Sequence, residues 1–332
     1  MKINNNSTYF IAEIGINHEG SLKRALKLIK LAKNSGVDAV KFQIFKPETM
    51  AQEDSKKTDL QKKNTSSKET LFQMWKRVSL KKNYFKKLKL YAKKNSLDFI
   101  CSAFDEESLD FLKFLKPSAI KVASSDINDI NLLMKIKKMK LPVIISTGMA
   151  TLNEIKNAIK IIGKKKTYVL HCVSMYPVPD KFINIHRMVT LEKKLKVIVG
   201  YSDHSKTIDA SIASIVLGAK IIEKHFTDSK KRIGADHSLS ADFNEMKQII
   251  NFSNKFNILR GSGQIQPTKK ELNYKKYFRK GIYAAKEIKK GEQFTEQNII
   301  KRRPENGTNI SIYKKLIGRR SKRGYKKFNS ID

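Results

Sequence analysis

Two histidines are the residues of this sequence best placed to do chemistry. His204 follows the run VIVGYSD, and His225 ends the run KIIEKH. Each run is short and largely apolar, as in a strand that is buried on both faces. Neighbouring strands lie about 4.8 Å apart, so imidazoles at two adjacent strand ends can reach one ion. The pattern predicts a divalent metal held by His204 and His225, with open positions for a substrate oxygen. A structural role for each histidine is the alternative.

Two lysines lie inside apolar runs, which distinguishes them from the many helix lysines. They are Lys41 in AVKFQIF and Lys121 in AIKVASS. A buried lysine needs an anionic partner. An ordinary ion pair with Glu13 or Asp203 is one possibility. The other is a site for phosphate or carboxylate, which these lysines would form with the serines that lie near neighbouring strand ends: Ser102, Ser124, Ser146 and Ser202.

Carboxylates and other polar groups also cluster at the ends of these runs. Glu223 lies two residues before His225 and shares its face of the strand, so it is a candidate weak ligand of the metal or a support for the histidine ligands. Glu19 and Asp236 follow strand-like runs, as salt-bridged loop residues or as ligands for substrate hydroxyls. Gln43 shares a face with Lys41, and one later run delivers a further pair of polar side chains, Ser174 and Tyr176.

These residues require a scaffold that brings eight strand ends together. The strand-like runs are FIAEIGI, AVKFQIF, DFICSAF, AIKVASS, PVIISTGM, YVLHCVS, VIVGYSD and KIIEKHF. Amphipathic helical patterns lie at 21–35, 83–95, 106–115, 130–138, 151–162, 184–195, 207–217 and 241–256. Eight alternating units predict a (β/α)8 TIM barrel, whose chemistry lies at the carboxyl ends of the strands.

Local signals refine this division of the chain. Ser21, Thr151 and either Ser205 or Thr207 stand where helix N-caps are expected. The polar segment 50–70 follows the second strand, so we expect a long loop over the barrel mouth.

The alternation ends near residue 257. We expect a barrel over 1–257, a polar linker with Gly and Pro over 258–278, and a small β-rich domain over 279–332. The last segment reads as short strands separated by Lys-Lys-Gly and Asn-Gly turns. A domain of this size is marginally stable alone, so it needs a packing partner.

Composition limits the remaining classes of protein. The chain has 332 residues, 68 Lys and Arg against 31 Asp and Glu, and a net charge of +37. That charge suits nucleic-acid or membrane-surface binding, but lysines spread over solvated helix faces explain it as well. No nucleic-acid motif, membrane-spanning run or signal-peptide pattern is present. Two cysteines within strand-like runs indicate no disulfide framework, so a reduced cytoplasmic protein is expected, with no membrane or nucleic-acid partner.

Several of these segments, taken in order, resemble one known family. IAEIGINHEGSL, VKFQIFKPE, IKVASSD, VIISTGMAT, LHCVSMYPVP, VGYSDHS and IEKHFTDSKKRIGADHS are similar to motifs of the sialic acid synthases. The segment IYAAKEIKKGEQFTEQNIIKRRPENG resembles the antifreeze-like SAF domain of the same family. The resemblance covers nearly the whole chain.

The resemblance implies a metal-dependent condensation of phosphoenolpyruvate with N-acetylmannosamine or a related N-acetylated hexose. The product would be N-acetylneuraminate or a related nonulosonic acid, with phosphate released by C–O cleavage. Mn²⁺ or Mg²⁺ on His204 and His225 would polarise the aldehyde of the open-chain sugar. Carbon 3 of phosphoenolpyruvate would attack that aldehyde, and water would then add at carbon 2. We expect the four residues Glu19, His204, Glu223 and His225 to take part in catalysis.

The resemblance also assigns binding roles by position. The phosphate and carboxylate would contact Lys41, Lys121, Ser124, Ser146 and Ser202, assisted by Ser102 and Ser174. The sugar would contact Glu19, Gln43, Tyr176 and Asp236. The family implies a domain-swapped homodimer in which the SAF domain covers the partner's barrel, and Arg303 would bind the acetamido group there.

Some residues depart from the family pattern. Ser174 stands where many members have Asn or Thr, and RRPENG places Glu305 near Arg303. Three other functions stay open: a legionaminic acid synthase of the same family, with the pseudaminic branch less favoured; a condensing enzyme for phosphorylated aldoses; and a basic nucleic-acid-binding protein.

Overall fold

The computed structural model describes residues 1, 3, 7–65 and 68–332. The chain divides into two compact units, Met1–Gly261 and Ser262–Asp332, and each is described by itself. In the first unit, eight parallel strands form a closed barrel in chain order. They are β1 (Tyr9–Gly15), β2 (Ala39–Ile44), β3 (Asp98–Ala103), β4 (Ala119–Val122), β5 (Val143–Ser146), β6 (Thr167–Cys172), β7 (Ile198–Asp203) and β8 (Ile221–His225).

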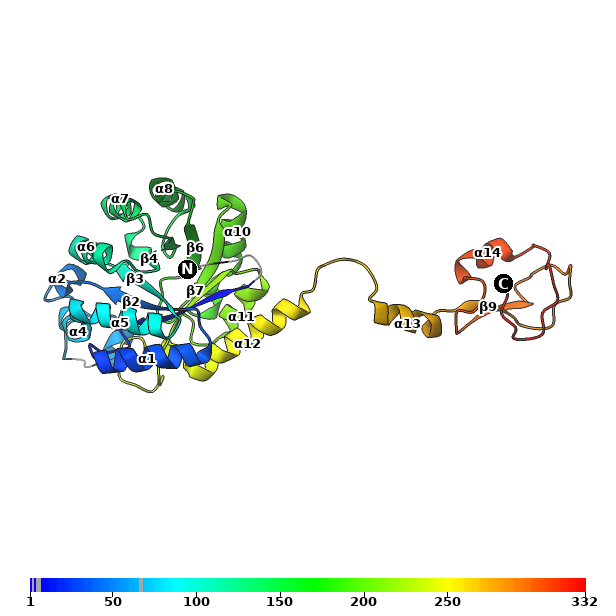
Figure 1. Cartoon of the computed structure of the whole chain (residues 1–332), viewed down its shortest axis with the longest axis horizontal. Helices are drawn as coiled ribbons and strands as arrows, with labels where there is room; N and C mark the ends of the chain where they lie inside the picture. Colours follow the sequence, from blue (N-terminus) through cyan, green and yellow to red (C-terminus); the bar gives the residue numbers. More distant parts are fainter. Residues whose placement is uncertain (2, 4–6, 66–67) are drawn as a thin grey trace. The chain divides into compact units, whose positions relative to one another are not determined.

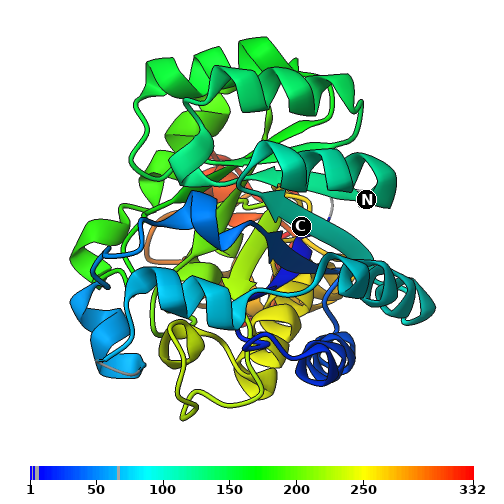
Figure 2. The same ribbon diagram turned by 90° about the vertical axis from the view of Figure 1, so that its left-hand side faces the viewer.

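Helices alternate with these strands and surround them (Figures 1 and 2). They are α1 (Leu22–Ser35), α5 (Lys82–Lys94), α6 (Glu106–Leu115), α7 (Ile130–Lys138), α8 (Leu152–Ile162), α9 (Asp180–Ile183), α10 (His186–Leu195), α11 (Asp209–Val216) and α12 (Phe243–Leu259). Short 3₁₀ turns lie at Ser124–Asp126 and His237–Leu239. The expected (β/α)8 barrel is confirmed. None of the helices in the described part of the chain has the length and apolarity needed to cross a membrane.

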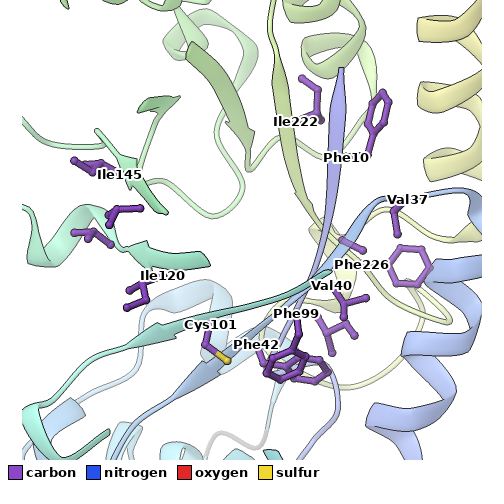
Figure 3. Packing of buried hydrophobic residues seen from close by; sticks show 14 of the residues in the cluster. Phe10, Val37, Val40, Phe42, Phe99, Cys101, Ile120, Ile145, Ile222 and Phe226 are labelled. Carbon is purple, nitrogen blue, oxygen red and sulfur yellow. The ribbon is translucent and has the colours of Figure 1, made fainter. Parts of the chain in front are cut away.

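The strand sequences explain the two layers of core. Outward side chains of the strands pack against the helices, as Figure 3 shows for Phe10, Phe42, Phe99, Ile120 and Ile222. Inward side chains fill the barrel below its mouth as a second cluster of eight: Tyr9, Ile11, Ala39, Ile100, Ala119, Ile144, Leu170 and Ile221. Strands buried on both faces need apolar residues at nearly every position. The polar exceptions therefore stand out near the strand ends.

Two predicted helix caps are confirmed and a third is wrong. The Ser21 side chain accepts a hydrogen bond from the Arg24 amide, and Thr151 forms a reciprocal capping box with Glu154. The helix α11 begins at Asp209, and neither Ser205 nor Thr207 caps it. The Ser205 backbone is instead bonded to Asp203 and Lys224.

The segment 50–70 contains more helix than the sequence analysis expected. Helices α2 (Pro47–Met50), α3 (Asp59–Asn64) and α4 (Leu71–Val78) lie in it or beside it, while 66–67 fall outside the described residues. Thr58 and Thr70 start α3 and α4 with capping boxes to glutamines. Helices of six and eight residues are too short for a clear hydrophobic period.

The second unit begins with a helix in the segment expected to be a linker. Helix α13 (Lys269–Phe278) starts at a Thr268–Glu271 capping box, and none of its ten residues is buried. The strands β9 (Gly281–Ala284) and β10 (Ile299–Arg302) pair antiparallel, and a short helix α14 (Tyr313–Leu316) follows a 3₁₀ turn at Ile310–Ile312. A small core holds this unit together: Ile282, Ala284, Ile288, Phe294, Ile299, Tyr325 and Ile331.

Candidate active site

A cavity of about 690 Å³ opens at the carboxyl ends of the barrel strands. Thirteen of the side chains predicted from the sequence line it: Lys41, Gln43, Ser102, Lys121, Ser124, Ser146, Ser174, Tyr176, Ser202, His204, Glu223, His225 and Asp236. Alternation along the strands explains this convergence, because residues two apart point to the same face. Glu19, also predicted in this unit, does not line the cavity, and Arg303 belongs to the second unit.

The two buried lysines lie among carboxylates on the cavity wall. Lys41 Nζ is 2.9 Å from Glu13 Oε1 and 3.9 Å from Glu223 Oε2. Lys121 Nζ is 3.5 Å from Glu223 Oε1 and donates a hydrogen bond to Ser146 Oγ at 2.6 Å. The ion pair of Lys41 with Glu13, which was the alternative reading for that lysine, is therefore present. Glu223 contacts the lysines, and it also accepts a hydrogen bond from Ser202 Oγ at 2.9 Å.

The carboxylates determine the charge of these lysines. Burial opposes the charged form of Lys41, but Glu13 and Glu223 outweigh burial and raise its pKa. Burial lowers the pKa of Lys121, and Glu223 offsets only part of this effect. Burial would raise the pKa of Glu223, yet the two lysines lower it overall. The wall thus presents two buried lysine amines that carboxylates and a serine already contact.

Serines complete this wall beside Gly148. The Gly148 amide donates to Ser124 Oγ at 3.0 Å, and Ser174 Oγ is buried with no hydrogen-bond partner. A Cβ on residue 148 would lie 2.2 Å from Ser174 Oγ and 2.9 Å from Ser124 Oγ. Only glycine therefore lets these hydroxyls approach the loop that follows β5.

The two histidines face each other across the same cavity. Their ring centroids lie 5.6 Å apart with an interplanar angle of 54°. His204 Nδ1 is 2.9 Å from the Val173 carbonyl oxygen, a contact that requires a proton on Nδ1, so a metal would bind this ring through Nε2 in its neutral form. Burial opposes the charged form of His204, but Cys172 and the Val173 carbonyl outweigh burial and raise its pKa. His225 Nδ1 is buried without a hydrogen-bond partner and lies 3.7 Å from Asp236 Oδ2. The Tyr176 ring stacks 4.2 Å from His204.

These donors fit a divalent metal. Burial, together with the positive charges of His204 and nearby lysines, lowers the pKa of His225 and keeps this imidazole neutral. A neutral ring nitrogen with no other partner is the form that binds metal, and a ring oriented by a backbone carbonyl is the usual arrangement of a ligand. Within the described residues, no group of three or more His, Cys, Asp and Glu is arranged around a common ion position. A metal here would therefore take its remaining ligands from substrate or water.

Asp236 forms the cavity wall beside the histidines. Burial, assisted by the Glu13 carboxylate, raises the pKa of Asp236 to about 7. Glu13 itself is a functional candidate that the sequence analysis treated only as a partner for Lys41. It lines the cavity, and its Oε1 accepts a hydrogen bond from Gln43 at 2.7 Å. A charged residue inside the apolar run FIAEIGI is the same signal that identified Lys41 and Lys121.

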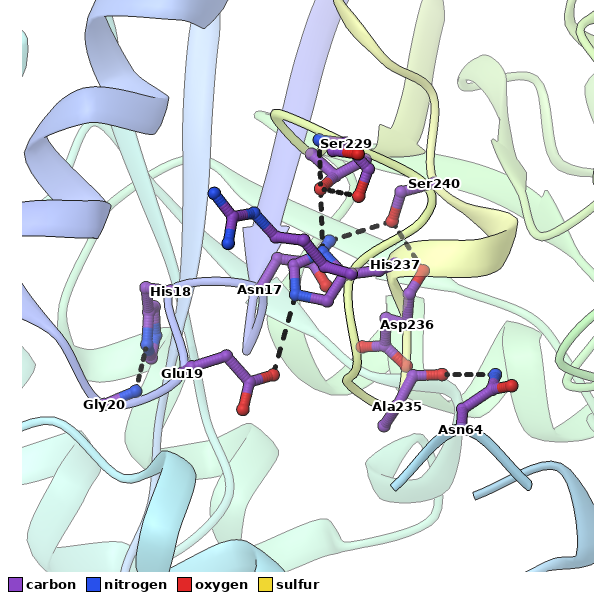
Figure 4. A network of polar contacts seen from close by, with 12 residues as sticks. Asn17, His18, Glu19, Gly20, Asn64, Ser229, Ala235, Asp236, His237 and Ser240 are labelled. Atoms are coloured by element: carbon purple, nitrogen blue, oxygen red, sulfur yellow. Dashed lines mark hydrogen bonds and ion pairs between the residues drawn. The ribbon is translucent and has the colours of Figure 1, made fainter. Parts of the chain in front are cut away.

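Glu19 lies in a separate polar network next to the cavity (Figure 4). One of its oxygens pairs with Arg77, and the other lies 3.7 Å from His237 Nε2. This is the salt-bridged role that the sequence left open for Glu19. Arg303 belongs to the second unit, where its guanidinium lies 5.9 Å from the Phe278 ring centroid.

The fold and this cavity define a class of protein: a (β/α)8-barrel enzyme with buried lysines and a histidine pair at the mouth of the barrel. Residues 28–265 match the NeuB family, and 279–324 match the SAF domain. The chain belongs to the NeuB family and is an enzyme of its sialic acid synthase class.

Individual relatives agree with this assignment. The chain is 38% identical to an N,N'-diacetyllegionaminic acid synthase of Campylobacter jejuni, covering 96% of this chain and 97% of that protein. It is 34% identical to a pseudaminic acid synthase of the same species, over 98% and 97% of the two chains. Among solved structures, an N-acetylneuraminic acid synthetase from Leptospira borgpetersenii superposes with a TM-score of 0.74 at 33% identity, covering 82% of this chain and 92% of that one.

Proposed function

We propose that this enzyme makes a nonulosonic acid by condensing phosphoenolpyruvate with an open-chain 2-acetamido sugar, releasing phosphate. The observation that carries this proposal is one cavity that contains both a wall of lysines and serines and a pair of imidazoles. The wall comprises Lys41, Lys121 and neighbouring serines, and the pair is His204 and His225. Phosphoenolpyruvate supplies two anionic groups for the wall, and the sugar supplies a carbonyl for the other side.

The wall is suited to an anion that arrives and departs. Lys41 and Lys121 are held in place by Glu13, Glu223 and Ser146 before any substrate binds. An incoming phosphate can share their remaining N–H donors without reorganising the wall. Ser174 Oγ has no other partner and is free to donate to the same ligand. Serine at this position thus retains one hydrogen bond at the phosphate end.

The histidine pair would hold Mn²⁺ or Mg²⁺. When bound, this ion supplies Lewis acid chemistry to the sugar carbonyl. The protein's own contribution is to orient the rings: Val173 fixes the tautomer of His204, and Tyr176 packs on its face. Asp236, Gln43 and Glu13 lie around the same side of the cavity and would bind sugar hydroxyls. An aspartate with a pKa of about 7 can either donate or accept such a hydrogen bond.

The acceptor sugar lies within a narrow class. The names of the relatives include N,N'-diacetyllegionaminic acid, whose name specifies two N-acetyl groups, and N-acetylneuraminic acid, which has one. N-acetylmannosamine and a 2,4-diacetamido hexose are therefore the two acceptors to compare. An apolar wall that includes Ile16, Trp75 and Phe104 would face the far end of either sugar.

We also propose that the enzyme acts as a domain-swapped homodimer in the cytoplasm. The second unit has its own small core, and Arg303 would reach the acetamido group of sugar bound in the partner's barrel. Cys101 and Cys172 are both free thiols, which suits a reducing compartment.

A phosphate-release assay tests the proposed reaction. The purified enzyme is incubated with phosphoenolpyruvate, Mn²⁺ and a panel of aldoses. Release is expected with N-acetylated hexoses that carry no phosphate. His204→Ala and His225→Ala should each lower turnover by at least about 100-fold, because either change removes a metal ligand. Release only with phosphorylated aldoses would identify the other condensing class. No release with any aldose, together with salt-dependent binding to nucleic acid, would contradict the proposal.

A further inference from the structure

A buried ion pair joins the two histidine-bearing strands on the outer side of the barrel wall. Asp203 of β7 is the register partner of Lys224 of β8, and its Oδ2 lies 3.0 Å from Lys224 Nζ. Neither side chain lines the cavity, whereas the next residues in the chain, His204 and His225, do. The exposed fractions of Asp203 and Lys224 are 0% and 1%. The pair therefore lies directly behind the two imidazoles.

This ion pair holds the backbone of the residue that follows His204. Asp203 Oδ1 accepts a hydrogen bond from the Ser205 amide at 2.8 Å, and Lys224 Nζ donates to the Ser205 carbonyl at 3.0 Å. Ser211 of α11 donates to Asp203 Oδ2 at 2.6 Å, which fixes the carboxylate in turn. Both backbone polar groups of Ser205 are thus bound to the pair, which constrains the path of the chain as it leaves β7.

The energetic balance indicates that stability alone does not explain this arrangement. Removing two charges from water costs several kcal/mol per ion, and an apolar pair of similar volume is often as stable as a buried ion pair. An apolar pair, however, could not bond Ser205. What Asp203 and Lys224 provide, and an apolar pair would not, is a fixed backbone conformation next to His204.

We propose that Asp203 and Lys224 are positioning residues that set the separation and direction of the His204 and His225 imidazoles for one divalent ion. This inference rests on the proposed metal role of the histidines. The pair itself contacts neither metal nor substrate. It acts through the Ser205 backbone on one strand and through the β8 backbone on the other.

The test measures Mn²⁺ affinity of the full chain without substrates, using the electron paramagnetic resonance signal of free Mn²⁺. In Asp203→Leu/Lys224→Met, both charges and both contacts with Ser205 are removed. The dissociation constant should rise by about 10- to 100-fold, the range seen when residues that orient metal ligands are lost. Lys224→Met alone is a milder change that still removes the donor to the Ser205 carbonyl, and a rise of the dissociation constant is expected for it as well if the double variant does not fold.

Two further variants separate positioning from charge. Asp203→Asn/Lys224→Gln is neutral but keeps an acceptor and a donor for Ser205, so its Mn²⁺ affinity should stay close to that of wild type. Lys27→Gln removes an equal charge from an ion pair with Asp228 in which the lysine side chain is 63% exposed. This variant should leave the Mn²⁺ affinity unchanged. Phosphoenolpyruvate affinity without metal, followed by fluorescence of the single tryptophan Trp75 in the cavity wall, should be unaltered in all variants.

The outcomes distinguish this inference from the proposed function. Wild-type protein that binds no Mn²⁺ would overturn the metal assignment and the positioning role together. Wild-type protein that binds Mn²⁺, with unchanged affinity in folded Asp203→Leu/Lys224→Met or Lys224→Met, would overturn the positioning role alone. A fall in phosphoenolpyruvate affinity parallel to the loss of Mn²⁺ affinity would indicate general disruption of the barrel and would also count against it.

Discussion

Individual buried residues account for much of the chemistry of this barrel and for part of its pH sensitivity. His237 is fully buried beside the cavity, with Nδ1 2.7 Å from Thr227 Oγ1 and Nε2 without a hydrogen-bond partner. Burial lowers the pKa of His237 to about 4. The folded state therefore favours the neutral form of the His237 imidazole, and protonation of this ring destabilises the folded state.

This shift predicts a loss of stability in mild acid. The unfolded chain takes up a proton on this histidine near pH 6.5, while the folded chain resists protonation down to about pH 4. The contribution of the neutral His237 to the free energy of unfolding is complete above pH 6.5. It is lost as the pH falls from 6.5 to 4, by up to about 3 kcal/mol. His237→Asn, which retains a donor for Thr227, should flatten the pH dependence of the unfolding free energy between pH 7 and 4.5.

Urea unfolding at a series of pH values measures this slope. His186→Gln is the matched control, since His186 is exposed on α10. Equal slopes for wild type and His237→Asn would show that the buried imidazole does not contribute to the acid sensitivity.

At the scale of elements, the site depends on how closely β7 approaches its neighbours. Gly200 pairs with Leu170 of β6, and a Cβ on residue 200 would lie 2.2 Å from the Ile221 carbonyl oxygen of β8. Glycine at position 200 therefore allows β7 to approach β8 more closely than a residue with a Cβ would. The same two strands carry His204 and His225 at their ends, so their spacing is also the spacing of the imidazoles.

Gly200→Ala should therefore weaken both the barrel and its metal site. The backbone must shift to accept the methyl group, at a cost of about 1–3 kcal/mol in unfolding free energy. Mn²⁺ affinity should fall because the strand ends move apart. Gly324→Ala, where the nearest atom is 3.6 Å from the new Cβ, is the control. Denaturant unfolding and Mn²⁺ titration of both variants measure the effect, and wild-type behaviour of Gly200→Ala would refute this account of the strand spacing.

At the scale of the whole molecule, the large positive charge and the second unit call for separate explanations. The buried lysines are Lys41, Lys57, Lys121 and Lys224, and the other described lysines are at least partly exposed. The net charge of +37 is thus carried mainly on the surface. The second unit has a core of its own, and the role proposed for it requires a second copy of the chain.

A subunit-mixing experiment tests the domain-swapped arrangement. His204→Ala and Arg303→Ala should each be nearly inactive alone. Equal mixing followed by subunit exchange should restore about one quarter of wild-type turnover, because half the dimers are mixed and each mixed dimer has one intact site. Exchange is checked independently of activity, by following the pairing of tagged with untagged wild-type subunits. No recovery despite exchange would mean that each barrel uses its own Arg303 or none.

Sequence by itself determined the barrel and most of the cavity wall. A parallel barrel of this kind needs eight apolar runs in series. A charged or imidazole side chain near the end of such a run is most readily accommodated in the cavity at the strand ends. Lys41, Lys121, His204 and His225 were therefore visible from pattern alone. Helix α3 was missed because six residues give no clear period, and α13 was missed because none of its ten residues is buried, so its sequence has no apolar face.

Only the tertiary structure decided which polar groups meet. Glu13 and Glu223 lie beside Lys41 because β1 stands between β2 and β8 once the barrel closes, and Glu223 meets Lys121 of β4 across the barrel interior. Glu19 turns to Arg77, a residue 58 positions away in the chain, and so lies outside the cavity. The Asp203–Lys224 pair likewise exists only when β7 and β8 stand in register. Packing and strand register determine which residues distant in sequence become partners. The periodicity of the sequence reports only which face of its own strand or helix a residue occupies, so it does not identify these partners.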